Sequence, residues 1–293
     1  GSSWYFLRYT DPKNDKVLAG LDKLAYWGQV DWYNGGMEHV TRHLIYSRFW
    51  NQFLYDIGAV LHREPYRKRT AQGLILGEDN EKMSKSKGNV INPMDIINEY
   101  GADTLRTYIL FIGDYEMPTP WNENGVKGVR RFLDKVWRLQ NKLALADFYS
   151  EESEASVHKT IKGVTEDIEN MKFNTAIAKL MTLTNEFTQK EALTMAEMET
   201  LLKLTYPFAP HMTEELYSQI GHKEGLVNAP WPEYDESKLA SDVVEVVVNI
   251  NGKVRDKMTV KTDLDDKAME RMAKSLPKIA DLLEGATIRK VIV

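Results

Sequence analysis

Four stretches of helix-forming sequence follow one another between residues 116 and 222. They cover residues 125–146, 157–171, 174–190 and 194–220, and Pro207 and Pro210 interrupt the last one. Consecutive helices joined by short connections bury their apolar faces most readily as a bundle. We therefore expect residues 116–222 to form a helical-bundle domain, which leaves the two ends of the chain to other kinds of fold.

Residues 1–115 alternate between strand and helix patterns. Residues 30–33 and 69–76 are typical of strands, and residues 38–57 of a helix that ends at Gly58. A second helix is predicted to begin at Asn92-Pro93, where an N-cap residue precedes a proline in the first turn, and to end at Gly101. Alternation of this kind predicts an α/β domain.

The C-terminal residues predict a third, smaller domain. Residues 243–250 and 253–260 are typical of strands, and the Asn251-Gly252 pair between them favours a type I′ hairpin turn. A helix over residues 265–284, with a restart at Pro277, and a strand over residues 288–293 complete a β-β-α-β domain at residues 242–293. Residues 223–241 form a proline-containing linker. Because the chain stops on a strand, we expect this domain to be truncated.

The amino-acid composition limits which kinds of protein this chain can be. With 43% hydrophobic and 28% charged residues among 293, the chain is typical of a soluble multidomain protein, for which we expect a cytoplasmic location and no membrane partner. It contains no cysteine, so disulfides and cysteine-bound zinc are excluded. The net charge of −5 argues against general polyanion binding, although a local basic cluster could still bind nucleic acid. The aromatic-rich opening, Ser2-Ser3-Trp4-Tyr5, looks like the interior of an element and suggests a piece of something longer.

One polar loop is the strongest candidate for chemistry. The run Glu81-Lys82-Met83-Ser84-Lys85-Ser86-Lys87-Gly88-Asn89 offers ammonium and hydroxyl donors that suit phosphate oxygens. Lys82 and Lys85 are the candidate catalytic residues because cationic donors stabilise a departing pyrophosphate. Lys87 is expected to face solvent or RNA, and Met83 to anchor the loop. The alternative is a solvated basic loop.

A second candidate site is Gly35-Gly36-Met37-Glu38-His39, placed between a predicted strand and a predicted helix. Glycines allow the backbone to approach a ligand, and a carboxylate at this position could bind both hydroxyls of a ribose. A tight turn in which Glu38 balances the helix N-terminus is an equally good interpretation. His39 and His43 are one helical turn apart, but no third ligand is evident, so we predict no metal site and expect either histidines with satisfied hydrogen bonds or pocket-lining histidines.

Two basic groups are candidates for contact with nucleic acid. Lys127, Arg131, Lys135, Arg138 and Lys142 recur at three- and four-residue steps along the first helix of the expected bundle. A run of one sign on one helix face suits a phosphate backbone, although a solvated face is the usual alternative. Lys253 and Arg255, just after the hairpin turn, could bind a backbone in the same way.

The loop sequence resembles the K-M-S-K-S signature of class I aminoacyl-tRNA synthetases, and its neighbours resemble the leucyl-tRNA synthetase family. The matching segments, in chain order, are residues 2–9, 35–39 (Gly35-Gly36-Met37-Glu38-His39), 43–49, 70–74, 100–106, 207–216 and 248–255. The first, the last and the Gly-Gly-x-Glu-His segment are specific to the leucyl enzymes, whereas residues 100–106 are shared widely among the aliphatic class I enzymes and residues 207–216 resemble their tRNA-binding helical domain. The resemblance implies that residues 1–115 are the second half of a Rossmann-like catalytic domain. It also implies that the bundle and the C-terminal domain bind tRNA.

The same resemblance implies roles for individual residues. Gly35, Gly36, Glu38 and His39 would bind the adenosine of ATP, and residues 82–86 (Lys82, Met83, Ser84, Lys85 and Ser86) would close over its triphosphate. Ser2, Tyr5 and His43 would line the leucine pocket. The enzyme would join leucine to ATP, supplied with Mg²⁺, as an adenylate and then transfer it to leucine tRNA.

Some parts of the family pattern are absent from this sequence, which changes what we expect the chain to do alone. The H-I-G-H-type motif and the editing domain precede Ser2 in the family order, and neither is present, nor is the leucine-specific insertion that some members carry before the loop. The N-terminal half of the same enzyme is therefore an expected partner, and the chain alone is expected to be inactive. The alternatives are a fragment of an isoleucyl, valyl or methionyl relative, or a tRNA-binding module without catalysis.

Overall fold

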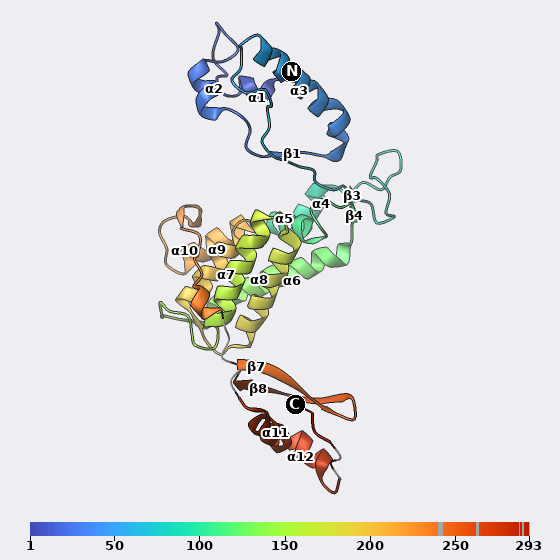
Figure 1. Cartoon of the computed structure of the whole chain (residues 1–293), viewed down its shortest axis with the longest axis vertical. Coiled ribbons are helices and arrows are strands. Elements are labelled where there is room, and N and C mark those ends of the chain that lie inside the picture. The colour runs from blue at the N-terminus through green and yellow to red at the C-terminus, as the bar shows by residue number, and fades with distance from the viewer. Residues whose placement is uncertain (240–242, 262–263, 287, 289, 293) are drawn as a thin grey trace.

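Three parts of the chain follow one another along the long axis of the molecule (Figure 1). The computed structural model describes residues 1–239, 243–261, 264–286, 288 and 290–292. The N-terminal residues lie at one end, a group of helices occupies the middle, and a hairpin with two short helices lies at the other end. This is an α/β arrangement joined to a helical one, as the sequence predicts. The exact domain boundaries stay predictions.

The N-terminal part combines short helices with one pair of parallel strands. Its elements are α1 (Tyr5–Arg8), α2 (Leu21–Trp27), β1 (Tyr33–Asn34), the turns η1 (Met37–His39) and η2 (Val40–Leu44), α3 (Ile45–Asp56) and β2 (Arg69–Thr70). The predicted helix over residues 38–57 therefore exists, but it begins as a 3₁₀ turn and a π-helical turn before α3 starts. Gly58, with φ of +77°, ends it as predicted because a residue just after a helix often adopts a left-handed conformation. Helices α1 and α2 were not predicted.

Both strands predicted in this part are shorter than expected. Residues 30–33 contribute one bridge, Val30 to Tyr66, and the first residue of β1. Residues 69–76 split into β2, which pairs with β1, and β3 (Ile75–Leu76), which pairs with β4 (Thr119–Pro120). Gly73 explains the split, because its N–H donates to Tyr115 and a Cβ atom there would lie 2.1 Å from the carbonyl oxygen of Met117. The chain turns toward another backbone at this glycine, so the prediction of one continuous strand was wrong.

Two helices connect the signature loop to the bundle. Asn92 caps α4 (Pro93–Tyr100) by accepting a hydrogen bond from the N–H of Met94, as its sequence predicts. Gly101, with φ of +91°, ends α4, but α5 (Ala102–Phe111) begins directly after it and was not predicted. A glycine read as a stop signal is here a joint between two helices.

The middle part is a bundle with a continuous apolar core. Its long helices are α6 (Glu123–Leu139), α7 (Glu154–Glu169), α8 (Phe173–Gln189), α9 (Met195–Thr205) and α10 (Pro210–Gln219). The four predicted stretches are confirmed as helical, although α6 ends at Leu139 and not at residue 146, and the break between α9 and α10 falls at the two prolines, as predicted. Core side chains that are fully buried come from every one of these helices, including Val126, Ile161, Leu180, Leu201 and Leu216. Two short strands, β5 (Leu143–Ala144) and β6 (Leu193–Thr194), pair in parallel within this part of the chain.

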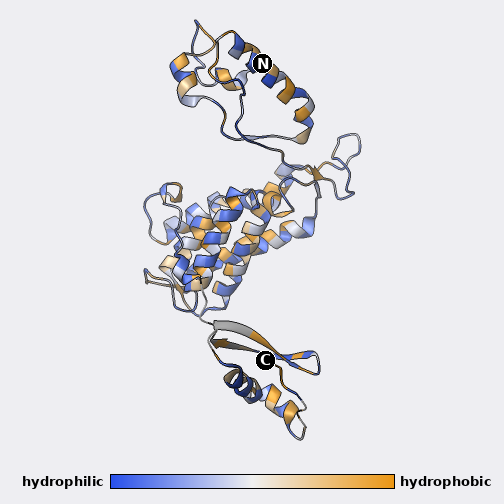
Figure 2. Cartoon of the chain, in the orientation of Figure 1, coloured by the Kyte–Doolittle hydropathy of each residue, from blue (hydrophilic) through white to orange (hydrophobic). Residues whose placement is uncertain are grey.

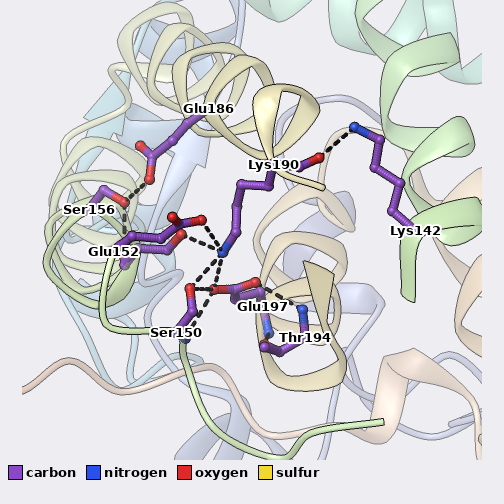
Figure 3. A network of polar contacts seen from close by, with 9 residues as sticks. Lys142, Ser150, Glu152, Ser156, Glu186, Lys190, Thr194 and Glu197 are labelled. Atoms are coloured by element: carbon purple, nitrogen blue, oxygen red, sulfur yellow. Dashed lines mark hydrogen bonds and ion pairs between the residues drawn. The ribbon is translucent and has the colours of Figure 1, made fainter. Parts of the chain in front are cut away.

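A buried ion pair joins three segments of this bundle (Figure 3). The ammonium of Lys190, just after α8, lies 2.7 Å from Oε1 of Glu197 in α9 and donates to the hydroxyls of Ser150 and Ser153. The Glu197 side chain is fully buried, and its other oxygen accepts the N–H of Thr194 in a capping box. The ends of α8 and α9 are thus fastened to the segment before α7.

The C-terminal part contains the predicted hairpin. Strand β7 (Val243–Ile250) pairs antiparallel with β8 (Lys253–Lys261), and Asn251 and Gly252 both have positive φ, as a type I′ turn requires. Helices α11 (Asp266–Ser275) and α12 (Pro277–Leu283) follow, with the restart at Pro277. Of the strand predicted at 288–293, residues 288 and 290–292 are not in a strand, while Arg289 and Val293 lie outside the described residues.

Hydrophilic and hydrophobic residues alternate along the helices of the middle part (Figure 2). Among the described residues, no helix is both long enough and apolar enough to cross a membrane.

Candidate nucleotide and amino-acid site

Asn89 holds the two ends of the signature loop together. Its Oδ1 accepts the N–H of Ser84 at 2.9 Å, and its Nδ2 lies 3.1 and 3.2 Å from the carboxylate oxygens of Asp79. Gly77 closes the start of the loop by donating its N–H to the carbonyl of Glu81. Gly88 has φ of +68°, which a glycine adopts without strain. The base of the loop is therefore held by hydrogen bonds among its own polar groups.

The three lysines of the loop have different surroundings. Lys87 forms an ion pair with Glu81 at 3.0 Å, whereas no carboxylate among the described residues lies within ion-pair distance of Lys82 or Lys85, both exposed. Met83 packs against the apolar core of the bundle, as an anchor should. The hydroxyls of Ser84 and Ser86 lie 3.2 Å apart. Two cationic groups are thus left available on a loop that is fixed at its base.

Gly36 and Glu38 have a direct steric relationship. A Cβ atom on Gly36 would lie 2.4 Å from Oε2 of Glu38, so any larger residue there would move the carboxylate from its present position over the backbone. The N–H of Gly35 donates to the carbonyl of Thr70 in β2, which fixes the pair at the end of the strands. Glu38 and His39 lie in the 3₁₀ turn η1 instead of opening an α-helix, which departs from the predicted geometry. Their predicted roles toward ATP stay predictions.

A cluster of aromatic rings surrounds His43. Nε2 of His43 lies 2.5 Å from the hydroxyl of Tyr33, which in turn lies 3.2 Å from the hydroxyl of Tyr5. The rings of Tyr5 and His43 stack at 5.9 Å. Tyr66 packs on Tyr33 at 4.4 Å and donates its hydroxyl to Ser47. The structure therefore brings Tyr5 and His43 together, and the backbone of Ser2, the third residue predicted to line the leucine pocket, also lies beside His43.

Burial governs ionisation in this cluster. It lowers the pKa of His43, and the nearby ring of His39 lowers it further, while the backbone of Ser2 opposes both effects. Nδ1 of His43 is nevertheless buried and makes no hydrogen bond of normal geometry. Burial, followed by the hydrogen bond with Tyr5, raises the pKa of Tyr33. The cluster thus favours a neutral imidazole among neutral phenols.

Sequence reasoning missed Tyr33 and Tyr66. Tyr33 could have been found, because it immediately precedes Asn34 and the Gly35-Gly36 pair at the end of a predicted strand. Tyr66 gives no such signal, since it lies in a connection and reaches the cluster only through the fold.

The rings of His39 and His43 are 6.3 Å apart. The described residues contain no group of three or more acidic or histidine side chains that could hold a metal ion.

The five basic residues predicted to form one stripe have different surroundings in the structure. Arg131 and Arg138 are exposed on α6, and Lys127 is exposed beside Glu123, with which it forms an ion pair. Lys135 donates to Oδ1 of Asn185 at 2.7 Å. Lys142 lies beyond the end of α6, contrary to the predicted helix over 125–146, and its ammonium donates to the carbonyls of Thr188 and Lys190. Its position there stabilises the C-terminus of α8.

Lys253 and Arg255 are exposed beside the hairpin turn. The pairing register moves from Val248–Asp256 to Asn249–Val254, so Arg255 is the extra residue of a β-bulge. No hydrogen bond or ion pair joins the signature loop at 81–89 to residues 35–43 within the described part of the chain. The two candidate nucleotide-binding segments are thus each well formed, but they are not linked by direct polar contacts.

Comparisons with known proteins match two parts of the chain to family models and the whole chain to a longer relative. Residues 43–119 match the class I tRNA synthetases (I, L, M and V), and residues 152–270 match the anticodon-binding domain of tRNA ligases. Over 292 residues, 100% of this chain, the sequence is 53% identical to a leucine–tRNA ligase from Alkaliphilus oremlandii (strain OhILAs). The chain is a homologue of leucine–tRNA ligase. It spans 36% of the length of that relative.

A solved leucine–tRNA ligase structure agrees with this assignment. It is a ternary complex of a LeuRS from Agrobacterium radiobacter with tRNA and LeuAMS, with a TM-score of 0.77 and 32% sequence identity. The similarity covers 97% of this chain and 39% of that one. Both of these relatives are leucine enzymes, and the similarity to each extends over nearly the whole of this chain. The signature loop lies inside the class I match, whereas α6 lies between the two matched segments.

Proposed function

We propose that this chain supplies the K-M-S-K-S side of the active site, and the tRNA-binding region, of an enzyme that attaches leucine to its tRNA. In the first step a carboxylate oxygen of leucine attacks the α-phosphorus of ATP, and pyrophosphate leaves. In the second step a terminal hydroxyl of the tRNA attacks the carbonyl carbon of the adenylate, and AMP leaves. Mg²⁺ would enter with ATP as part of the substrate.

The arrangement of the signature loop carries this proposal. Lys87 is engaged by Glu81, and Asn89 fixes the base of the loop, so Lys82 and Lys85 remain as exposed cations on a defined support. Cationic donors of this kind stabilise the negative charge that develops on departing pyrophosphate. Ser84 and Ser86 can donate further hydrogen bonds to phosphate oxygens. We assign the catalytic role to Lys82 and Lys85.

The segment at the end of β1 is proposed to bind adenosine and leucine. Gly35 and Gly36 would let the backbone approach the nucleoside, with His39 nearby, and the Glu38 carboxylate would accept hydrogen bonds from ribose hydroxyls. Ser2, Tyr5 and His43 would line the leucine pocket. A neutral, aromatic surround suits an aliphatic side chain because it presents no charge to it.

The proposed tRNA contacts come from the basic residues of the bundle and the hairpin. Arg131 and Arg138 are exposed on α6, and Lys253 and Arg255 are exposed at the hairpin. Exposed cations of one sign suit a phosphate backbone. Lys127 and Lys135 each have a partner within the chain, so we expect weaker contributions from them. We expect Lys142 to contribute least to tRNA binding. We propose that the whole reaction takes place in the cytoplasm.

The remaining part of the ligase is the proposed protein partner. Helix α3 buries the polar residues Ser47 and Asn51, while Phe49 is 71% exposed and Ile45 55% exposed. Large apolar side chains exposed on one helix indicate that another protein surface packs against it. Because residues 1–293 contain no H-I-G-H-type motif, the segment that carries this motif would complete both the site and the cover for α3.

Pyrophosphate exchange tests this proposal. The 293-residue chain alone should not exchange pyrophosphate into ATP when leucine is present, and it should do so once combined with the remaining segment of a leucine–tRNA ligase such as the 53%-identical relative. In the combined enzyme, Lys85→Ala should abolish exchange. Robust exchange by the chain alone would contradict the division of the site. A combined complex that binds tRNA but never forms adenylate would favour a tRNA-binding module.

A further inference from the structure

Two segments more than a hundred residues apart meet at one buried carboxylate. Asp103, in the first turn of α5, is only 9% exposed. Its Oδ2 accepts the N–H of Met212 at 2.7 Å, and its Oδ1 lies 2.7 Å from Nδ1 of His211 and 3.4 Å from the His211 backbone nitrogen. These contacts join α5 to the first turn of α10.

The start of α10 explains why a carboxylate is needed. Pro210 occupies the first position of α10 and has no N–H, so His211 and Met212 present the first free donors. Asp103 takes both of them from a different helix. A negative charge at a helix N-terminus is favourable because it opposes the helix dipole.

The same face of α5 makes two further contacts with the segment before α10. Nη2 of Arg106 donates to the carbonyl of Pro207 at 3.3 Å, and the buried hydroxyl of Thr107 donates to the carbonyl of Phe208 at 3.4 Å. Residues three and four apart lie on one face of a helix, so Asp103, Arg106 and Thr107 act together. The joint is therefore polar and directional, although it lies beside the apolar core.

The other end of this connection is the signature loop. Helix α4 begins four residues after Asn89, and Met83, Ile96 and Ile97 pack on the bundle core. The hydroxyl of Thr104 donates to the carbonyl of Tyr100, and Arg130 of α6 donates to the same carbonyl. The loop, α4 and α5 are thus held as one unit, and Asp103 connects that unit to α10.

We infer that Asp103 is a positioning residue that sets where the signature loop lies relative to the tRNA-binding bundle. It acts by fixing α5, and through α4 the loop, to α10. This inference rests on the proposed function of the loop.

The test is Asp103→Asn in the complete, combined enzyme. The asparagine side chain keeps one oxygen that can accept a hydrogen bond, but its NH₂ group replaces the other oxygen and cannot accept one. One of the two contacts with the N-terminus of α10, to His211 or to Met212, is therefore lost. We expect kcat for pyrophosphate exchange to fall about 10- to 100-fold, since small displacements of a catalytic group have effects of that size. The KM for leucine should change less than about twofold, because the leucine pocket is elsewhere.

Glu214→Gln is the matched control. Glu214, also in α10, accepts the N–H groups of Leu226 and Val227 at 2.7 and 3.0 Å, and so makes the same kind of double contact without any connection to the loop. Both variants should lower the melting temperature, and both are assayed below it. Only Asp103→Asn should lower kcat. If Asp103→Asn proves too unstable, Thr107→Val provides a milder loss at the same joint and should lower kcat in the same direction.

The outcomes separate this inference from the proposed function. If Lys85→Ala abolishes exchange while Asp103→Asn and Thr107→Val leave kcat unchanged, the joint is structural and the inference is overturned. Equal losses of kcat in Asp103→Asn and Glu214→Gln would also overturn it, because general destabilisation would then explain both. If Lys85→Ala has no effect, the proposed function of the loop itself fails.

Discussion

The hydroxyl of Tyr33 lies 2.5 Å from Nε2 of His43, and this contact connects the end of β1 to the π-helical turn before α3. Single π-helical turns occur often at functional sites, because the extra residue changes the direction of one side chain. Here the turn presents His43 to Tyr33 and Tyr5. The proposed leucine pocket therefore depends on a local departure from regular helix geometry.

The ionisation of His43 gives a pH prediction. Its pKa is lowered from the ordinary value of 6.5, by burial first and by His39 second. The neutral form is thus preferred in the folded state, and its contribution to stability is present above pH 6.5 and is lost as the pH falls through the lowered pKa. An NMR titration should show a pKa below 6.5, and the His43→Gln variant should unfold with a flatter dependence on acid pH. A titration at 6.5 or above would contradict the burial argument.

The buried pair Lys190–Glu197 predicts a large effect on stability. Lys190→Met leaves the Glu197 carboxylate without its cation in a site that is closed to solvent. Removing one partner of a buried pair typically lowers the free energy of unfolding by about 3–5 kcal/mol. Urea unfolding would measure the loss. The double variant Lys190→Met/Glu197→Leu should recover part of it, because no buried unpaired charge then remains; Glu152, the other carboxylate paired with Lys190, is exposed to solvent.

Glu197 also predicts how the bundle responds to acid. Burial alone would raise the pKa of Glu197, but hydrogen bonds from Lys190, Ser150 and the backbone of Thr194 outweigh it and lower the pKa from 4.5. This contribution to stability is present above pH 4.5 and is lost as the pH falls through the lowered pKa. Glu197→Gln should therefore reduce the loss of stability below pH 4.5. An unchanged pH profile would show that other carboxylates dominate acid unfolding.

Two glycines on α6 should respond to alanine in opposite directions. A Cβ atom at Gly128 would meet nothing closer than 4.0 Å, so Gly128→Ala should raise the free energy of unfolding by about 1 kcal/mol through helix propensity. A Cβ atom at Gly125 would lie 2.7 Å from the buried ring of Tyr108, so Gly125→Ala should lower stability. Thermal unfolding of the two variants checks both signs. Stabilisation by both would mean that the Tyr108 ring moves freely.

Gly36→Ala should weaken ATP binding in the combined enzyme. The new methyl group would displace the Glu38 carboxylate, because the present separation leaves 2.4 Å. We expect the KM for ATP to rise about tenfold, the size of one lost hydrogen bond to a charged group, with a smaller change in the KM for leucine. Thermal unfolding provides the control for folding. Equal changes in both KM values would indicate a general distortion of the segment.

The salt dependence of tRNA binding tests the basic residues separately. Each phosphate contact removed should reduce the slope of log K against log salt by about 0.7–0.9. Arg131→Ala and Arg138→Ala should show this reduction, because both side chains are exposed on α6. Lys142→Ala should instead lower the stability of the bundle, since its ammonium binds two carbonyls at the end of α8. Unchanged slopes for both arginines would indicate a solvated face.

The sequence by itself determined the features that depend on local chemistry. Asn251-Gly252 set the hairpin turn, Asn92-Pro93 set the start of α4, the prolines at 207 and 210 separated α9 from α10, and residues 82–86 carried the signature of the family. These features follow from backbone preferences and short-range hydrogen bonds, which a few neighbouring residues decide.

Only the tertiary structure decided how distant segments meet. Gly101 gave no sign that α5 would follow it, Gly73 gave no sign that another backbone approaches there, and Lys142 lay in a helical pattern that ends before it. Asp103 and His211 are separated by 108 residues and meet only because α5 packs against the α9–α10 junction. Such contacts depend on burial and on the pairing of polar groups across the fold, which residue spacing along the chain does not encode.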